Sequence, residues 1–93
     1  MTGCIVQIWF EAETEHQERP PNFSIVETEF EDFASFCEMV DSNQLIGGAR
    51  LWTIRNEDGS RKITRRQPCA FRGSAVVRCQ LPTWRFVDDA AAN

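Results

Sequence analysis

The sequence contains a single histidine and no tyrosine, and this shortage of proton-transfer groups weighs against catalysis. General acid–base and nucleophilic mechanisms need side chains that converge on one substrate. His16 lies in a polar stretch, the chain has no glycine-rich phosphate loop, and no motif surrounds a serine or a cysteine. Carboxylates are plentiful, but their spacing singles out no catalytic pair. The sequence therefore favours a non-catalytic protein, and it predicts no catalytic residue and no cofactor.

Metal-ligand spacing is missing as well. The four cysteines show no C-x-x-C pattern, and no group of histidines accompanies them, so no metal site is predicted. These cysteines are Cys4, Cys37, Cys69 and Cys79. If Cys69 and Cys79 are neighbours on adjacent strands, they could form a disulfide in an oxidising compartment. The expectation is two free thiols in a reducing cytosol.

Long hydrophobic runs are also absent. No stretch of about 18 apolar residues occurs, so no membrane span is predicted. The N-terminus shows no basic region followed by an apolar one, so no signal peptide is expected, and we interpret the protein as cytoplasmic. A chain of 93 residues is expected to form one domain, here over residues 1–87, with a frayed tail over residues 88–93.

The first half of the chain shows one strand, a second short strand and one helix. Alternation over residues 4–10 predicts a strand that turns Val6, Ile8 and Phe10 to the core and Trp9 to the other side. A polar loop with a Pro-Pro pair follows, and then a short strand over residues 23–26.

The helix is predicted from its cap and its apolar stripe. Thr28-x-x-Glu31 fits a capping box at its start, and Asn43 is a suitable left-handed residue at its end. The apolar residues that recur at helical spacing are Phe33, Phe36, Cys37 and Val40. This stripe is expected to pack on the core, with an acidic side turned to solvent.

Residues 50–87 are predicted to form three consecutive antiparallel strands. Asp58-Gly59 between two β-rich runs is typical of a hairpin turn. The predicted register of this hairpin pairs Ile54 with Ile63, Trp52 with Arg65, and Arg55 with Lys62. In this register Trp52, Ile54 and Ile63 all turn toward the helix.

A second hairpin is predicted around residues 72–74, where it would pair Cys69 with Cys79. Pro68 and Pro82 interrupt the strands and are expected to curve the sheet. The fold class that follows is α+β, with a single helix packed on one face of a curved, mainly antiparallel sheet of four to five strands. The predicted order is strand, possible short strand, helix and three strands.

Charge is divided unevenly along the chain. Residues 1–45 carry ten acidic side chains against Arg19, a net of −9, and residues 46–93 carry nine basic against four acidic, a net of +5. Arg55, Lys62, Arg66 and Arg78 are predicted to share the polar face of the sheet, with Trp9 beside them. Such a face could stack bases and bind phosphates. The net charge of −4 opposes this role, because an acidic protein repels polyanions at long range.

The reading that we prefer from the sequence is a small non-catalytic binding module that forms a homodimer and binds a protein partner. One helix cannot cover a sheet of this size, so apolar and edge surface is left for an interface. The candidate partner-binding residues are Trp9, Arg55, Lys62, Arg66, Arg78 and Trp84. The alternatives are nucleic-acid binding through the arginine face, an acidic inhibitor that imitates phosphates, and a small-molecule binder with a helix–sheet pocket.

Overall fold

A computed structural model describes residues 3–10 and 23–88 of the chain. The predicted Pro-Pro loop and residues 89–93 of the predicted tail lie outside these ranges. The elements in chain order are β1 (Ile5–Phe10), β2 (Ser24–Thr28), α1 (Phe33–Asp41), β3 (Leu45–Arg55), β4 (Arg61–Arg72), the 3-10 turn η1 (Gly73–Ala75), β5 (Val76–Gln80) and β6 (Phe86–Val87).

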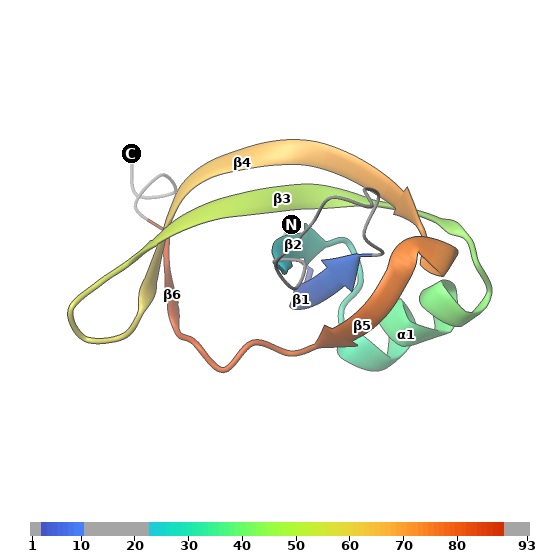
Figure 1. Cartoon of the computed structure of the whole chain (residues 1–93), viewed down its shortest axis with the longest axis horizontal. Coiled ribbons are helices and arrows are strands. Elements are labelled where there is room, and N and C mark those ends of the chain that lie inside the picture. Colours follow the sequence, from blue (N-terminus) through green and yellow to red (C-terminus); the bar gives the residue numbers. More distant parts are fainter. Residues whose placement is uncertain (1–2, 11–22, 89–93) are drawn as a thin grey trace, which may run out of the picture.

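The described strands form one curved, open sheet in the order β5-β1-β2-β3-β4-β6. Every neighbouring pair is antiparallel except β4 and β6, which are parallel. The long strands β3 and β4 arch together over β1 and β2, and α1 lies at one end of the arch (Figure 1). Within the described residues, the α+β class with one helix is confirmed, but the sheet is mixed and has six strands where four to five mainly antiparallel ones were predicted.

The predicted three-strand meander is wrong, because β4 and β5 are not paired. β5 pairs with β1, on the far side of the sheet, and the turn between β4 and β5 is a corner packed on the end of α1. The Gly73 amide donates to the Gln44 carbonyl (3.2 Å), and the Ser74 amide donates to Asn43 Oδ1 (2.8 Å). These contacts direct the chain away from β4 toward the opposite edge.

The predicted pairing of Cys69 with Cys79 is wrong too, because it depended on the meander. Cys69 lies opposite Gly48, and Cys79 lies opposite Ile8, so the two cysteines are not cross-strand neighbours. All four cysteines are free thiols. Cys79 instead lies near Cys37 of α1. Burial, together with Cys37, raises the pKa of the Cys79 thiol to about 11, which keeps it protonated at neutral pH.

The predicted β3–β4 register is correct at one end and wrong at the other. Trp52 lies opposite Arg65 as predicted, but a bulge follows, so Thr53 lies opposite Ile63 and Ile54 lies opposite Lys62. A bulge adds one residue to one strand and shifts every later pair. Ile54 and Ile63 therefore point to opposite sides of the sheet. Ile63 is 3% exposed and Ile54 is 53% exposed.

The helix begins later than the capping-box prediction. Thr28 belongs to β2, where its hydroxyl is buried and donates to the Cys4 carbonyl (2.9 Å). The N-cap is Asp32, whose Oδ1 accepts from the Ser35 amide (2.8 Å). Hydrogen bonding to Ser35 lowers the pKa of Asp32. The predicted end is confirmed, because Asn43 has a φ of 54°.

Two apolar clusters lie on opposite faces of the sheet, because neighbouring residues of β1 and β2 contribute to different clusters. The first lies beneath α1 and contains the buried residues Val6, Ile8, Val26, Phe36 and Ile46, with the predicted helix stripe packed against them. The second contains Ile25, Leu51 and Ile63, with Ile5, Phe23, Trp84 and Phe86 around them. The sheet is therefore covered by α1 on one face and by the segment 81–88 on the other.

Trp52 and Ile54 were predicted to turn toward the helix into the core, and that prediction is wrong. α1 has nine residues and spans about 13 Å, whereas β3 has 11 residues and spans about 36 Å. Ile46 lies under the helix. Trp52 lies on the same side of β3 but beyond the end of the helix. Leu51, which points to the opposite side of β3 from Trp52, is the buried residue of this part of the strand.

Candidate binding surface on the β3–β4 hairpin

β3 continues past β2 and past the helix that flank it. The ladder between them runs from Leu45 opposite Arg72 to Arg55 opposite Arg61. On the other side of β3, the ladder with β2 ends where Ile25 lies opposite Leu51. Within the described ranges, β3 beyond Leu51 thus has β4 as its neighbour and no strand on its other edge. The hairpin end projects from the body of the molecule (Figure 1).

The turn at the hairpin end is held by a short polar network. The Asn56 amide donates to the Ser60 carbonyl (2.8 Å), and Gly59 has a φ of 87°, a left-handed conformation that favours glycine. Asp58 accepts from the Ser60 amide (2.9 Å) and hydroxyl (2.6 Å), and its other oxygen accepts from Arg85 (2.7 Å). These bonds, those to Ser60 above all, lower the pKa of the Asp58 carboxyl. The Asp58 carboxylate is therefore already hydrogen-bonded within the molecule.

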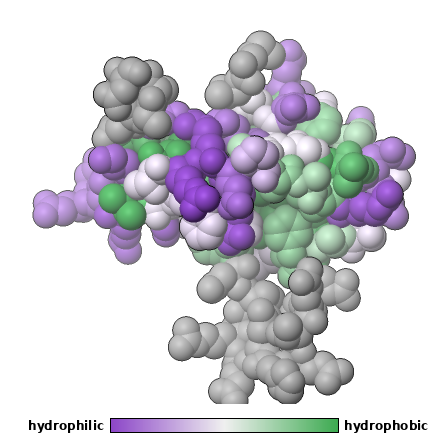
Figure 2. Space-filling model, turned by 90° about the horizontal axis from the view of Figure 1, so that it is seen from above, coloured by the Kyte–Doolittle hydropathy of each residue, from purple (hydrophilic) through white to green (hydrophobic). Residues whose placement is uncertain are grey.

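One side of the hairpin presents exposed arginine and apolar side chains together, and we call it the hairpin face. Its residues are Arg50, Trp52, Ile54, Arg65 and Gln67, of which Arg50 lies opposite Gln67 and Trp52 opposite Arg65. All five are exposed, with Trp52 at 40%. Seen from above, the described part of the molecule shows a region of gathered hydrophilic side chains with hydrophobic ones beside it (Figure 2).

The electrostatic character of the hairpin face is positive. The Arg50 guanidinium carbon lies 4.6 Å from the centroid of the Trp52 ring, a cation–π contact that orders both side chains. Arg65 lies across from the same ring. Neither arginine has a carboxylate partner in the described part of the chain. An exposed indole flanked by two cations can therefore bind a group that is both apolar and negatively charged.

The residues predicted from the sequence are placed differently. Arg55, Arg66 and Arg78 share the side opposite the hairpin face, but that side belongs to the second apolar cluster and is partly covered by the C-terminal segment. Lys62 lies opposite Ile54 and so shares the side of the hairpin face. The prediction that these four cations form one surface is wrong, since the bulge turned Lys62 away from the others.

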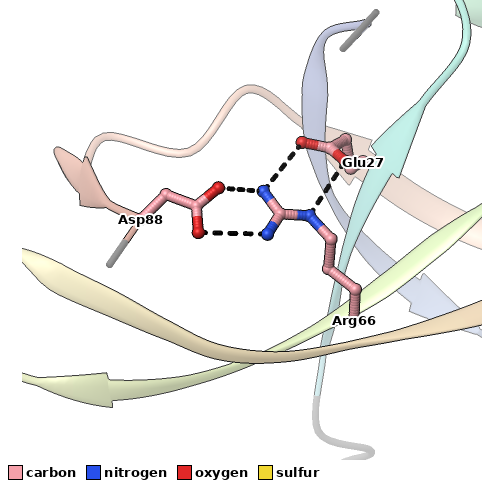
Figure 3. A network of polar contacts seen from close by, with 3 residues as sticks. All are labelled: Glu27, Arg66 and Asp88. Atoms are coloured by element: carbon pink, nitrogen blue, oxygen red, sulfur yellow. Dashed lines mark hydrogen bonds and ion pairs between the residues drawn. The ribbon is translucent and has the colours of Figure 1, made fainter. Parts of the chain in front are cut away.

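Arg66 is engaged within the molecule. Its Nε lies 3.2 Å from Glu27 Oε1, its Nη1 donates to Asp88 Oδ1 (3.1 Å), and its Nη2 also pairs with Asp88 (Figure 3). These bonds, first to Asp88 and then to Glu27, raise the pKa of Arg66. The network joins β4, β2 and the C-terminal segment. Asp88, which the sequence assigned to the tail, is thereby held to the sheet.

Trp9 and Trp84 come together around Phe23. The Trp84 ring stacks on Phe23 with centroids 5.4 Å apart, and the Trp9 ring tilts against it at 5.7 Å. The Arg78 guanidinium carbon lies 4.7 Å from the centroid of the Trp9 ring, and that of Arg61 lies 4.4 Å from the centroid of the Trp84 ring. Trp9 therefore packs against an arginine of its own chain. Both indoles are half-buried parts of the aromatic cluster.

Arg50, Trp52 and Arg65 were missed by the sequence analysis. The wrong set of alternate residues along β3 was assigned to the core. Because side chains alternate along a strand, burying Ile54 also buries Trp52 and exposes Leu51. The opposite phase would have buried Leu51 and exposed Arg50, Trp52 and Ile54 together. The run Arg-Leu-Trp-Thr-Ile contains a cation and two large apolar residues at alternate positions, and this pattern was the available signal.

The chain matches no model of a known protein family, no curated protein and no solved structure. Among the described residues, no helix has the length and hydropathy needed to cross a membrane. The same residues contain no group of three or more histidine, cysteine or carboxylate side chains arranged to hold a metal ion.

Proposed function

We propose that the protein is a non-catalytic binding module that holds a protein partner on the hairpin face. The segment bound there is acidic and partly apolar, with its carboxylates near Arg50 and Arg65 and its apolar side chains on Trp52 and Ile54. The observation that carries this proposal is the exposed Trp52 ring, held by Arg50 and flanked by Arg65 without a carboxylate nearby among the described residues.

The residue types on this face are those that contribute most to protein–protein affinity. Tryptophan and arginine are enriched among interface residues whose truncation costs the most binding energy. The stacking of Arg50 on Trp52 restricts both side chains before binding, so less rotamer entropy is lost in the complex. Positive charge at the rim of an apolar patch also speeds the encounter with an acidic partner.

A display selection with a random peptide library tests the proposal. We expect the wild-type protein to enrich acidic peptides that contain apolar residues, and we expect Trp52→Ala with Arg65→Glu to lose them. Arg72→Glu is the matched control, because Arg72 is also an exposed arginine of β4 but lies at its opposite end. Peptides that bind the double variant as tightly as the wild type, or a selection without acidic enrichment, would contradict the proposal.

We also propose that the chain forms a homodimer through the edge of β5. β5 is the terminal strand of the described sheet, and Val77 within it and Leu81 directly after it are 68% and 52% exposed. Two such edges can pair antiparallel about a twofold axis. The hairpin face is a poor self-interface, because two copies would bring arginines together. Light scattering should show a dimer at tens of micromolar that Val77→Glu dissociates, and a strict monomer would overturn this proposal.

Single-stranded nucleic acid is the second candidate ligand of the hairpin face. An exposed tryptophan beside arginines can stack a base and bind phosphates. The net charge of −4 makes this candidate weaker than an acidic peptide segment. A salt-dependent mobility shift with mixed-sequence DNA or RNA, lost in Arg65→Glu, would favour it. No shift at low salt would remove it.

A further inference from the structure

A pocket of about 330 Å³ lies at the point where β2 begins and β3 runs on without it. The residues that line it are Phe23, Ser24, Ile25, Arg50, Leu51, Trp52, Thr53 and Arg61. Alternation along β3 places Arg50 and Trp52 on one side of the sheet and Leu51 and Thr53 on the other. The pocket therefore spans the free edge of β3 and draws on both sides of the sheet. It lies apart from α1, unlike the helix–sheet pocket considered from the sequence.

Two arginines are among the residues that line this pocket, and the guanidinium group of each rests on a tryptophan ring. Arg50 lies over Trp52 at 4.6 Å, and Arg61 lies over Trp84 at 4.4 Å. Stacking on a ring occupies the face of a guanidinium group and leaves the N–H groups at its edge for a ligand. No carboxylate of the described residues lines the pocket. The charge that it presents is therefore positive.

Arg61 also carries an unused donor. Its Nε is buried and has no hydrogen-bond partner among the described residues. Buried donors are rarely left unpaired in folded proteins, so Arg61 retains capacity for a further acceptor. A carboxylate or phosphate oxygen supplies the strongest acceptor for an arginine N–H.

The remaining walls favour a planar ring. Phe23 and Trp52 provide aromatic surface, Leu51 provides aliphatic surface, and the hydroxyls of Ser24 and Thr53 can hydrogen-bond to substituents. Small-molecule pockets span about 300–1,000 Å³, so this one suits a ligand at the small end of that range.

We infer that this pocket binds a small ligand in which a planar aromatic ring carries a carboxylate or a phosphate. The anionic group binds Arg61, and the ring packs against Phe23, which lies in the same apolar cluster as the Trp84 ring under Arg61. This inference goes beyond the proposed protein-binding function, and it is separable from it. Arg61 and Phe23 belong to the pocket alone, whereas Ile54 and Arg65 belong to the hairpin face alone.

Calorimetric titration with benzoate, adenosine monophosphate and inorganic phosphate tests the inference. We expect saturable binding of benzoate or adenosine monophosphate with a dissociation constant of roughly 1 mM or tighter, and much weaker binding of inorganic phosphate, which has no ring. Which of the two aromatic probes binds more tightly shows whether the anion is a carboxylate or a phosphate. Arg61→Gln should weaken binding roughly tenfold or more, since it removes a charged donor.

Arg65→Gln is the matched control, because it makes the same change on the same strand outside the pocket, and it should leave the affinity within about twofold. Backbone amide shifts of the wild-type protein on titration give a second measurement that does not depend on the folding of a variant. They should concentrate at residues 23–25 and 50–53. The inference is overturned if no probe binds, if inorganic phosphate binds as tightly as the aromatic anions, if the shifts lie elsewhere, or if both variants bind alike.

Discussion

Arg66 lies where β2, β4 and the C-terminal segment meet, and its guanidinium bonds to carboxylates from both of the other two. The side chains of Glu27 and Asp88 are 13% and 26% exposed, so both carboxylates depend on Arg66 for compensation of their lost hydration. At the scale of single residues, Arg66 therefore stabilises the fold and does not serve to bind a partner. A cation that the sequence predicts to be free for binding can instead form ion pairs with carboxylates that are distant in the chain.

Arg66→Gln is expected to destabilise the fold by about 2 kcal/mol. The value lies below the 3–5 kcal/mol typical of breaking a fully buried pair, because the Arg66 side chain is 30% exposed and solvent screens the pair. Urea unfolding measures the change. Arg65→Gln, an exposed neighbour on the same strand, should change stability by less than about 0.5 kcal/mol. Equal effects of the two substitutions would show that the network contributes nothing.

Ser60→Ala is expected to move the pKa of Asp58 upward, toward the ordinary value of 3.8. The Ser60 hydroxyl is the largest cause of the lowered pKa, and Arg85→Ala should have a smaller effect because Arg85 contributes less. A lowered carboxyl pKa stabilises the fold above pH 3.8, and this contribution is lost as the pH falls through the lower folded value. Carboxyl chemical shifts of the two variants measure it. A larger effect of Arg85→Ala would reverse this assignment.

At the scale of elements, the corner at η1 decides the topology. Gly73 packs so closely on α1 that a Cβ there would lie 2.2 Å from the Val40 carbonyl oxygen. The turn therefore cannot open into a hairpin between β4 and β5 without separating from the helix. Glycine is required here for close approach, not for its backbone angles.

Gly73→Ala is expected to destabilise the protein by about 2–3 kcal/mol, because the added methyl meets backbone atoms that cannot move aside separately. Gly47→Ala is the control, since nothing lies within 4 Å of a Cβ at that exposed strand position. It should change stability by less than about 1 kcal/mol, in either direction. Thermal unfolding of both variants measures the difference, and a neutral Gly73→Ala would mean that the corner is not tightly packed.

The elements that depend on neighbouring residues were predicted well, and those that depend on distant contacts were not. The strand at residues 4–10, the stripe of α1 and the left-handed Asn43 all follow from local periodicity and local backbone preference. The η1 corner depends on Val40, more than 30 residues earlier. The β3–β4 bulge has no marker in the sequence, and it changed the side to which Lys62 points. It adds to the separate error along β3, where Trp52 and Ile54 were assigned to the core in place of Leu51.

At the scale of the whole molecule, one sheet separates two apolar clusters that are closed in different ways. α1 closes the first, and the segment 81–88 crosses from β5 to β6 and closes the second with Trp84 and Phe86. The same segment is fixed to β4 by β6 and by the Asp88 pair with Arg66. The face that the sequence offered for binding is therefore largely used for folding.

Trp84→Ala is expected to cost about 3 kcal/mol, because it removes the ring that packs on Phe23, Phe86 and Arg61. Trp52→Ala removes the same side chain from the hairpin face, where it is 40% exposed, and should cost less than about 1 kcal/mol. Chemical denaturation of the two variants measures the difference between their free energies of unfolding. Similar losses from both would indicate that Trp52 also belongs to the core and would weaken the proposed binding surface.

The pairing of β1 with β5 has a consequence for how the chain acquires its shape. β1 and β2 can pair with each other early, but the Gln7–Gln80 pair and the Glu27–Arg66 ion pair form only after the residues between them have been synthesised. Contacts between residues so far apart slow folding, because long loops must close first. While residues 76–88 are still inside the ribosome, β1 and β2 expose an apolar face and an open edge. A nascent chain stalled at that stage is the form of this protein most prone to aggregate or to recruit a chaperone.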